Sequence, residues 1–173
     1  MKSGPTDENE FLALVGANRQ RILRICRVYA WNPQDQEDLY QEVLFQVWRA
    51  LPGMKDRAHA NTWLYRVALN TAISFVRKET AGGGRHVAVA QDGIRELLES
   101  RQQTAPPDNP QIEQLYDAIG RLDKMEKAVI TLFLEDLSYA EMAEVLGLQP
   151  GHVGVIIHRA KKALSSLMEE AKP

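Results

Sequence analysis

The chain has 173 residues, of which 45% are hydrophobic and 25% charged, and its formal net charge is −2. These values are typical of an ordinary soluble globular protein and exclude both a disordered chain and a membrane-spanning one. No run approaches the roughly 20 apolar residues that a bilayer span needs, and the start MKSGPTDENE lacks an apolar signal core, so we expect a cytoplasmic protein without membrane insertion.

Three amphipathic helices are predicted in the first part of the chain. Apolar residues recur at spacings of three, four and seven over residues 10–30 and again over residues 35–51. In the second of these helices one row carries Leu39, Val43, Val47 and Leu51. A third helix is predicted from a cap at Asn61 or Thr62 to about residue 79.

A segment rich in glycine and proline follows at residues 80–110. Three consecutive glycines stand near its start and Pro-Pro-Asp-Asn-Pro near its end, with a possible short helix at residues 94–100. We predict a flexible linker here, which divides the chain into a first domain of residues 1–79 and a second domain of residues 111–173.

Four helices are predicted after the linker, at residues 112–122, 124–135, 139–146 and from Pro150 to about residue 170. The third of them opens with the capping box S-x-x-E and ends at a glycine, so the last two fit the description of a helix-turn-helix. No segment alternates as a strand does. The predicted fold is therefore all-α, with a three-helix and a four-helix domain.

Charge is sorted by face on two of the predicted helices. Asp35, Asp38 and Glu42 share one face at spacings of three and four. Such a face suits a basic protein partner and repels DNA, although a solvated acidic face at a helix N-terminus is the alternative.

The helix that follows has the opposite character. Its outward row holds only cationic, amide and hydroxyl side chains up to residue 78, and these groups grip phosphates and contact bases. A solvated face is again the alternative. The row consists of Arg66, Asn70, Ser74, Arg77 and Lys78.

The stretches DQEDLYQEVLFQVWRALPG and NTWLYRVALNTAISFVRK resemble region 2 of bacterial sigma factors of the extracytoplasmic function (ECF) type in the sigma-70 family. The stretch LSYAEMAEVLG followed by HRAKKAL resembles the region 4 of that family, in the same order along the chain. The resemblance implies a sigma factor that binds core RNA polymerase and directs promoter recognition and transcription initiation for a stress or signal regulon. It also implies an anti-sigma factor as a further partner, and no cofactor.

Site residues follow from the resemblance at the positions that match. The second helix of the family docks on the polymerase, and the matching positions are Asp38, Leu39, Gln41, Glu42, Phe45 and Trp48. The third helix and the loop before it capture the minus-ten element of the promoter, and the positions are Lys55, Arg57, Asn61, Thr62, Trp63, Arg66, Asn70, Ser74, Arg77 and Lys78. The last helix of the family contacts the minus-thirty-five element, and Gly151 and Arg159 are at matching positions here. His152, Val155, Ile156 and Lys162 of the same helix are further candidates, although they do not follow from the match.

The chain departs from the family in the last helix, where Gly154, Val155 and Ile156 replace the usual K-S-R. Because two charges are missing, we expect weaker salt-sensitive binding to duplex DNA. Three explanations are open. The apolar side chains could contact thymine methyl groups beside His152, they could form a patch for another protein such as an anti-sigma factor, or Ile156 could belong to the core.

No catalytic signature is present. The four histidines stand apart without metal-ligand spacing, and the glycines of the linker lack the lysine of a phosphate-binding loop, so we expect neither an enzyme nor a metal site. The alternative function is a stand-alone helix-turn-helix transcriptional regulator. Such a regulator binds its operator without polymerase, whereas a sigma factor needs the core enzyme.

Overall fold

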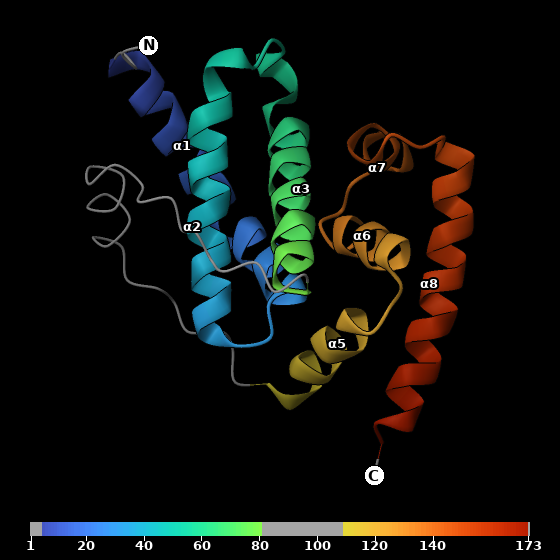
Figure 1. Ribbon diagram of the computed structural model, residues 1–173. Coiled ribbons are helices and arrows are strands. Elements are labelled where there is room, and N and C mark those ends of the chain that lie inside the picture. Colours follow the sequence, from blue (N-terminus) through green and yellow to red (C-terminus); the bar gives the residue numbers. More distant parts are fainter. Residues whose placement is uncertain (1–4, 81–108, 173) are drawn as a thin grey trace.

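The computed structural model describes residues 5–80 and 109–172, which form seven α-helices and contain no strand (Figure 1). The all-α prediction is confirmed for these residues. The predicted short helix at residues 94–100, and nearly all of the predicted linker, lie outside them. The elements are α1 (Pro5–Tyr29), α2 (Pro33–Ala50), the 3-10 turns η1 (Leu51–Gly53) and η2 (Arg57–His59), α3 (Ala60–Thr80), α5 (Pro110–Gly120), α6 (Lys124–Phe133), α7 (Tyr139–Leu146) and α8 (Pro150–Glu170).

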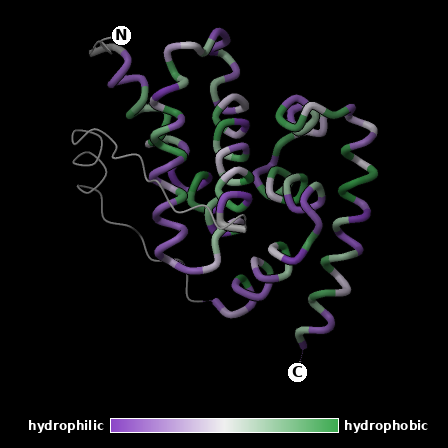
Figure 2. The backbone as a smooth tube through the Cα atoms, in the orientation of Figure 1, coloured by the Kyte–Doolittle hydropathy of each residue, from purple (hydrophilic) through white to green (hydrophobic). Residues whose placement is uncertain are grey.

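Helices α1, α2 and α3 pack against one another and form the N-terminal set. The predicted apolar row of α2 is buried along its whole length, because Leu39, Val43 and Val47 face this core and Leu51 continues it into η1. Hydrophobic and hydrophilic residues alternate along the helices in Figure 2, as amphipathic packing requires.

The helix caps explain where several elements begin. The Asn32 side chain accepts a hydrogen bond from the backbone nitrogen of Asp35 at 2.8 Å and so starts α2. The predicted capping box of α7 is confirmed: Ser138 Oγ accepts from the Glu141 nitrogen at 3.1 Å, and Glu141 accepts from the Ser138 nitrogen at 2.7 Å. Gly147 ends α7 in the left-handed region, with φ of 69°.

The predicted start of α3 was wrong. Asn61 and Thr62 lie inside the helix, which begins at Ala60 directly after η2. The turn η2 is itself capped by Asp56, whose side chain accepts from the Ala58 nitrogen at 3.1 Å. The capping side chain is therefore that of Asp56, which precedes the predicted caps Asn61 and Thr62 by more than one turn.

Helices α5 to α8 form the C-terminal set, in which α5, α6 and α7 all pack against α8. Helix α8 stands at the edge of the molecule opposite α1 and α2 (Figure 1). Val153, Ile157 and Ala160 point from α8 into this core. The two sets also touch each other directly, because α7 packs against α3 and α5 packs against α1.

Among the described residues, no helix combines the length and the apolar character that crossing a membrane requires. The same residues contain no cluster of three or more histidine, cysteine or acidic side chains arranged to hold a metal ion. The one cysteine, Cys26, is buried in α1, and burial raises the pKa of its thiol.

Candidate functional site

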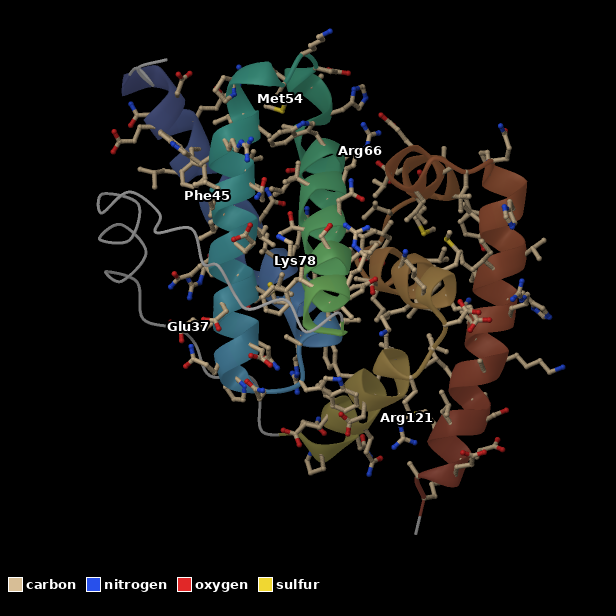
Figure 3. The ribbon with its side chains drawn as sticks, in the orientation of Figure 1. Glu37, Phe45, Met54, Arg66, Lys78 and Arg121 are labelled. Carbon is tan, nitrogen blue, oxygen red and sulfur yellow. The ribbon has the colours of Figure 1, made fainter. Side chains whose placement is uncertain are left out.

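An acidic surface covers part of α2. Asp38 and Glu42 are partly exposed, and each carboxylate accepts a hydrogen bond from a glutamine one turn away, at 3.1 Å from Gln34 and 2.9 Å from Gln46. Glu37 lies on the same helix on the side turned away from α3 (Figure 3). The cap geometry removes Asp35 from this surface, because its carboxylate is buried beside Asn32. The predicted acidic face is therefore present on α2, but it consists of Asp38 and Glu42 without Asp35.

The apolar positions expected to contact a partner differ in exposure. Phe45 is partly exposed and points away from α3 (Figure 3). Trp48 is also partly exposed, and its ring meets Phe11 of α1 edge to face with centroids 5.1 Å apart. Leu39 is fully buried, with 0% of its surface exposed, so its expected role as a surface contact is corrected. The row of α2 that packs on α1 and α3 holds Leu39 in the core.

A cationic and polar row runs along α3. Arg66, Asn70, Arg77 and Lys78 are exposed and Ser74 is partly exposed. No acidic residue precedes Glu79 on this helix, so the row presents positive charge and amide groups to solvent. This arrangement suits the phosphates and base edges of nucleic acid.

The beginning of α3 shows a second correction. Thr62 is buried and cannot present its hydroxyl to a base in this conformation. Trp63 is partly buried, and Asn61 is exposed, with its side-chain oxygen accepting a hydrogen bond from Asn18 of α1 at 3.0 Å.

The loop before α3 holds a local ion pair. His59 Nδ1 lies 2.5 Å from Asp56 Oδ2, and both side chains are exposed. The hydrogen bond to Asp56 raises the pKa of His59, and the same bond lowers the pKa of Asp56. Of the two cations predicted to contact DNA here, Lys55 is exposed and Arg57 forms an ion pair with Glu10 of α1.

The helix-turn-helix consists of α7 and α8, and its turn exposes one face of α8. Gly151, His152, Val155, Arg159 and Lys162 are exposed, and Val155 has 57% of its surface accessible. Ile156 has only 2%, so the structure places it in the core and corrects its expected role as a DNA contact. The third explanation for the apolar segment, a core role for Ile156, is the one that this packing favours.

The ring of Tyr139 limits the size of the side chain at position 154. A β-carbon at this position would lie 3.3 Å from the ring of Tyr139, which packs over the glycine from the first turn of α7. The usual side chain at this position would therefore meet an aromatic ring. Of the three unusual residues, only Val155 is left to face solvent.

Arg159 is less free to bind DNA than the sequence suggests. Its Nη2 lies 3.9 Å from Asp123 and 3.7 Å from Glu126, two acids at the start of α6. These long and exposed contacts are weak, so a phosphate can compete for the guanidinium.

Sequence reasoning missed three residues that matter in this arrangement. Arg24 and Glu135 form a bidentate ion pair between α1 and the turn after α6, with nitrogen to oxygen distances of 2.6 and 2.8 Å. Tyr139 covers Gly154. The available signal for Glu135 was its position directly after the apolar stretch of α6, where a carboxylate is costly unless it is paired.

Comparisons with known proteins agree with the resemblance. The family model for sigma-70 region 2 matches residues 14–81, and the model for sigma-70 region 4 matches residues 112–164. Together the two matches cover more than half of the chain.

Similar proteins align over almost the whole chain. RNA polymerase sigma factor SigV of Bacillus subtilis is 26% identical over 165 residues, which cover 95% of this chain and 94% of SigV. ECF RNA polymerase sigma factor SigW of the same organism is 24% identical over 177 residues, covering 95% and 91%. The fold is also similar to that of sigma factor RpoE from Bartonella quintana, solved in complex with the anti-sigma factor NepR, with a TM-score of 0.65, 18% identity and coverage of 95% and 98%.

Proposed function

The chain belongs to the sigma-70 family, and from this premise we propose that it acts as an ECF-type sigma factor, which binds core RNA polymerase and directs promoter recognition and transcription initiation. The observation that carries the proposal is the presence of regions 2 and 4 in one chain, in order and separated by about thirty residues. RNA synthesis itself is then the reaction of the polymerase. This chain binds the polymerase and the promoter and catalyses no step itself. It acts in the cytoplasm, where the polymerase is found.

We assign polymerase binding to the exposed side of α2. Asp38 and Glu42 supply negative charge, and Phe45 and Trp48 supply partly exposed aromatic surface beside it. Aromatic anchors with a charged rim are a common composition of protein interfaces, and the charge favours a basic partner. Gln41, also partly exposed, completes this surface, whereas Leu39 supports it from the core.

We assign the opened minus-ten element to α3 and its preceding loop. Extruding a base from the duplex costs a few kcal/mol, which stacking and hydrogen bonds to the base edge must offset. Trp63 can stack, and Asn61 and Asn70 carry amides that donate to and accept from a base edge. The DNA phosphates are bound by five cations and by the hydroxyl of Ser74. The cations are Lys55, Arg57, Arg66, Arg77 and Lys78.

We assign the minus-thirty-five element to the exposed face of α8. Gly151 and His152 lie in the first turn of α8, where backbone N–H groups have no acceptor within the helix, so these groups can bind a phosphate. Val155 is the one exposed apolar side chain of the central segment and can contact a thymine methyl group. Arg159 and Lys162 extend the same face.

These roles divide the chain into a domain of residues 1–79 that binds polymerase and the minus-ten element, a linker of residues 80–110, and a domain of residues 111–173 that binds the minus-thirty-five element. An anti-sigma factor is a further partner, which could bind either domain. The stand-alone regulator remains the other function considered. The match to region 2 does not favour it, because such a regulator has no need of a polymerase-binding surface.

A pull-down with purified core RNA polymerase tests the proposal, followed by run-off transcription on a library of genomic fragments. We expect the chain to bind the core enzyme and to create start sites that are absent without it. Tight binding to duplex DNA together with no binding to polymerase would establish the regulator instead.

The surface on α2 has its own test in the double reversal Asp38→Lys with Glu42→Lys. We expect binding to the core enzyme to fall at least about tenfold, which corresponds to about 1.4 kcal/mol. Reversal of Glu169 and Glu170, two exposed acids at the end of α8, is the matched control and should leave binding unchanged. If the double reversal on α2 binds as tightly as the wild type, α2 is not the docking helix.

A further inference from the structure

We propose that Asn18 of α1 is a positioning residue for base recognition. It holds the side-chain amide of Asn61 so that the donor Nδ2, and not the acceptor Oδ1, faces the DNA. Asn61 then selects a base with a carbonyl acceptor, thymine or guanine, at the position of the minus-ten element that it contacts. The inference rests on the proposed function and deepens it, because it assigns a class of base to one residue of α3.

Asn18 is a polar residue in the core between α1 and α3. Only 2% of its surface is exposed, and a buried amide is stable only when its donors and its acceptor have partners. The two helices pack directly on each other, so the side chain of Asn18 can reach from α1 to the first turn of α3. There its Nδ2 donates a hydrogen bond to Oδ1 of Asn61 at 3.0 Å.

Two further partners fix which way round the Asn18 amide lies. Its Nδ2 also donates to the backbone oxygen of Leu14 at 2.9 Å, and a carbonyl oxygen can only accept. Its Oδ1 accepts from Nη1 of Arg21 at 3.2 Å, and a guanidinium can only donate. Exchanging the nitrogen and the oxygen of Asn18 would place acceptor against acceptor and donor against donor at these two contacts. The group that Asn18 turns toward Asn61 is therefore a donor.

Arg21 is itself held by a residue of α3. Its guanidinium lies 5.9 Å from the centre of the ring of Tyr65, one turn after Asn61 on the same helix. Tyr65 is buried, so the ring that Arg21 faces belongs to the core. The contacts that orient Asn61 thus start and end on α3 and pass through α1.

The bond with Asn18 decides which group of Asn61 faces solvent. An asparagine side chain can in general both donate to and accept from a base. Asn61 is exposed, but its Oδ1 is directed at α1 by the bond with Asn18. Its Nδ2 is the other arm of the amide and has no acceptor among the residues that the structure describes. Asn61 therefore presents a hydrogen-bond donor outward.

Bases differ in what they offer to such a donor. Thymine O4 and guanine O6 are acceptors, whereas the amino groups on cytosine N4 and adenine N6, at the corresponding ring positions, are donors. A donor that faces another donor loses its water without gaining a partner, which is worse than a contact that is merely absent. Asn61 therefore favours thymine or guanine over adenine or cytosine.

A second contact from α1 reaches the same DNA-binding segment. Glu10, about two turns before Asn18, forms an ion pair with Arg57 in the loop before α3. Arg57 is one of the cations assigned to the DNA phosphates. Helix α1 therefore positions both a cation for the DNA backbone and an amide for a base.

The test uses RNA polymerase holoenzyme assembled from core enzyme and the full chain. Run-off transcription is measured on a promoter from the fragment library, with each base pair of the minus-ten element replaced in turn by the other three. Asn61→Ala identifies the base that Asn61 contacts, as the position at which this variant loses a preference of the wild type. At this position thymine is compared with adenine, and guanine with cytosine, so that the kind of base pair to be opened stays constant.

We expect the wild type to favour thymine over adenine, and guanine over cytosine, at least about fivefold. Asn61→Asp should reverse the preference, because the new carboxylate accepts from Asn18 with one oxygen and presents the other oxygen to the base. Asn18→Ala should reduce the ratio to less than about twofold, because the amide of Asn61 can then turn either way.

The matched control is Cys26→Ala, a buried truncation about two turns further along α1, which should keep the wild-type ratio. If Asn18 only stabilises the fold, Asn18→Ala lowers transcription from all templates by the same factor and leaves the ratio unchanged. Hydrogen exchange of side-chain amides, followed by NMR of the free chain, checks the geometry without polymerase or DNA. The Nδ2 protons of Asn18 should exchange slowly in the wild type and faster in Asn61→Ala, and those of Asn61 should exchange rapidly.

Three results would overturn the inference: an unchanged ratio in Asn18→Ala, a wild-type preference for adenine or cytosine at the position found with Asn61→Ala, or no position that responds to Asn61→Ala. Rapid exchange of the Asn18 amide protons would overturn it as well. All of these results leave binding to core polymerase intact. Failure of the wild type to bind core polymerase refutes the proposed function itself, and the selection of a base with it.

Discussion

The ring of Tyr139 lies over Gly154 and leaves only 3.3 Å to a β-carbon at that position. This contact joins the first turn of α7 to the first turns of α8, the two helices of the helix-turn-helix. Glycine in a helix interior is about 0.5–1 kcal/mol less stable than alanine, and the contact with the ring offsets part of this difference at position 154.

The first prediction concerns the substitution Gly154→Ala. The new methyl group gains helix propensity but presses on Tyr139, a residue that is 46% exposed and whose ring can move aside. We therefore expect a net gain in the free energy of unfolding of less than about 1 kcal/mol. Urea unfolding followed by circular dichroism measures it.

The control for this prediction is the same substitution in a Tyr139→Ala background. Without the ring the methyl group meets nothing, so the gain should rise to the full value of about 1 kcal/mol. An equal gain in the two backgrounds would mean that the ring does not restrict this position.

The second prediction separates core from surface on α2. Leu39 is fully buried in the row that packs on α1 and α3, so Leu39→Ala should cost about 2–5 kcal/mol of unfolding free energy. Phe45→Ala removes a partly exposed ring and should cost less stability but weaken binding to core polymerase.

Stability and polymerase binding must both be measured to interpret Leu39→Ala and Phe45→Ala. Denaturant unfolding gives the stability, and binding is measured at a temperature where Leu39→Ala is still folded. If folded Leu39→Ala binds polymerase much more weakly than Phe45→Ala, then Leu39 contributes to the interface directly and its assignment to the core alone is wrong.

The third prediction concerns the pH dependence of the loop before α3. The pKa of His59 is raised from 6.5 and that of Asp56 is lowered from 3.8, in both cases mainly by the hydrogen bond between them. The raised pKa means that the stabilisation from His59 is fully present below pH 6.5 and is lost as the pH rises through the value in the folded state. The stabilisation from Asp56 is present above pH 3.8 and is lost as the pH falls through its own lowered value.

NMR titration of the His59 ring measures the effect. In Asp56→Asn the midpoint of His59 should fall relative to the wild type, because the carboxylate that stabilises the imidazolium is gone. A midpoint of His59 that does not respond to Asp56→Asn would show that the pair does not form in solution.

The sequence predicted local features well because their causes are local. The capping box of α7 and the apolar row of α2 depend on residues within a few positions of one another, and both are found in the structure. The pairing of Arg24 with Glu135 spans 111 residues and depends on how two sets of helices meet. No periodicity encodes such a contact.

Errors in the candidate site have the same origin. A match to a family motif places a residue on a helix but leaves open which side of the helix faces the core. Leu39 lies at a position that matches the family and Ile156 at one that departs from it, and both are buried because each belongs to the apolar row of its own helix. The predicted apolar row with Val43 already included Leu39, and a core role for Ile156, three residues after Val153, was one of the three explanations for the apolar segment.

The fourth prediction uses two neighbouring residues of α8 with opposite exposure. Val155 is 57% exposed and Ile156 is 2% exposed, so Val155→Arg should leave stability within about 0.5 kcal/mol of the wild type, while Ile156→Arg should lose more than about 4 kcal/mol by burying an unpaired charge. If α8 contacts duplex promoter DNA, Val155→Arg in the complex with polymerase should also bind more tightly and steepen the dependence of log affinity on log salt concentration by about one. Denaturant unfolding and salt titrations of promoter binding measure the two effects. A stable Val155→Arg variant with an unchanged salt dependence would place this face of α8 away from the DNA and leave Val155 available for a protein partner.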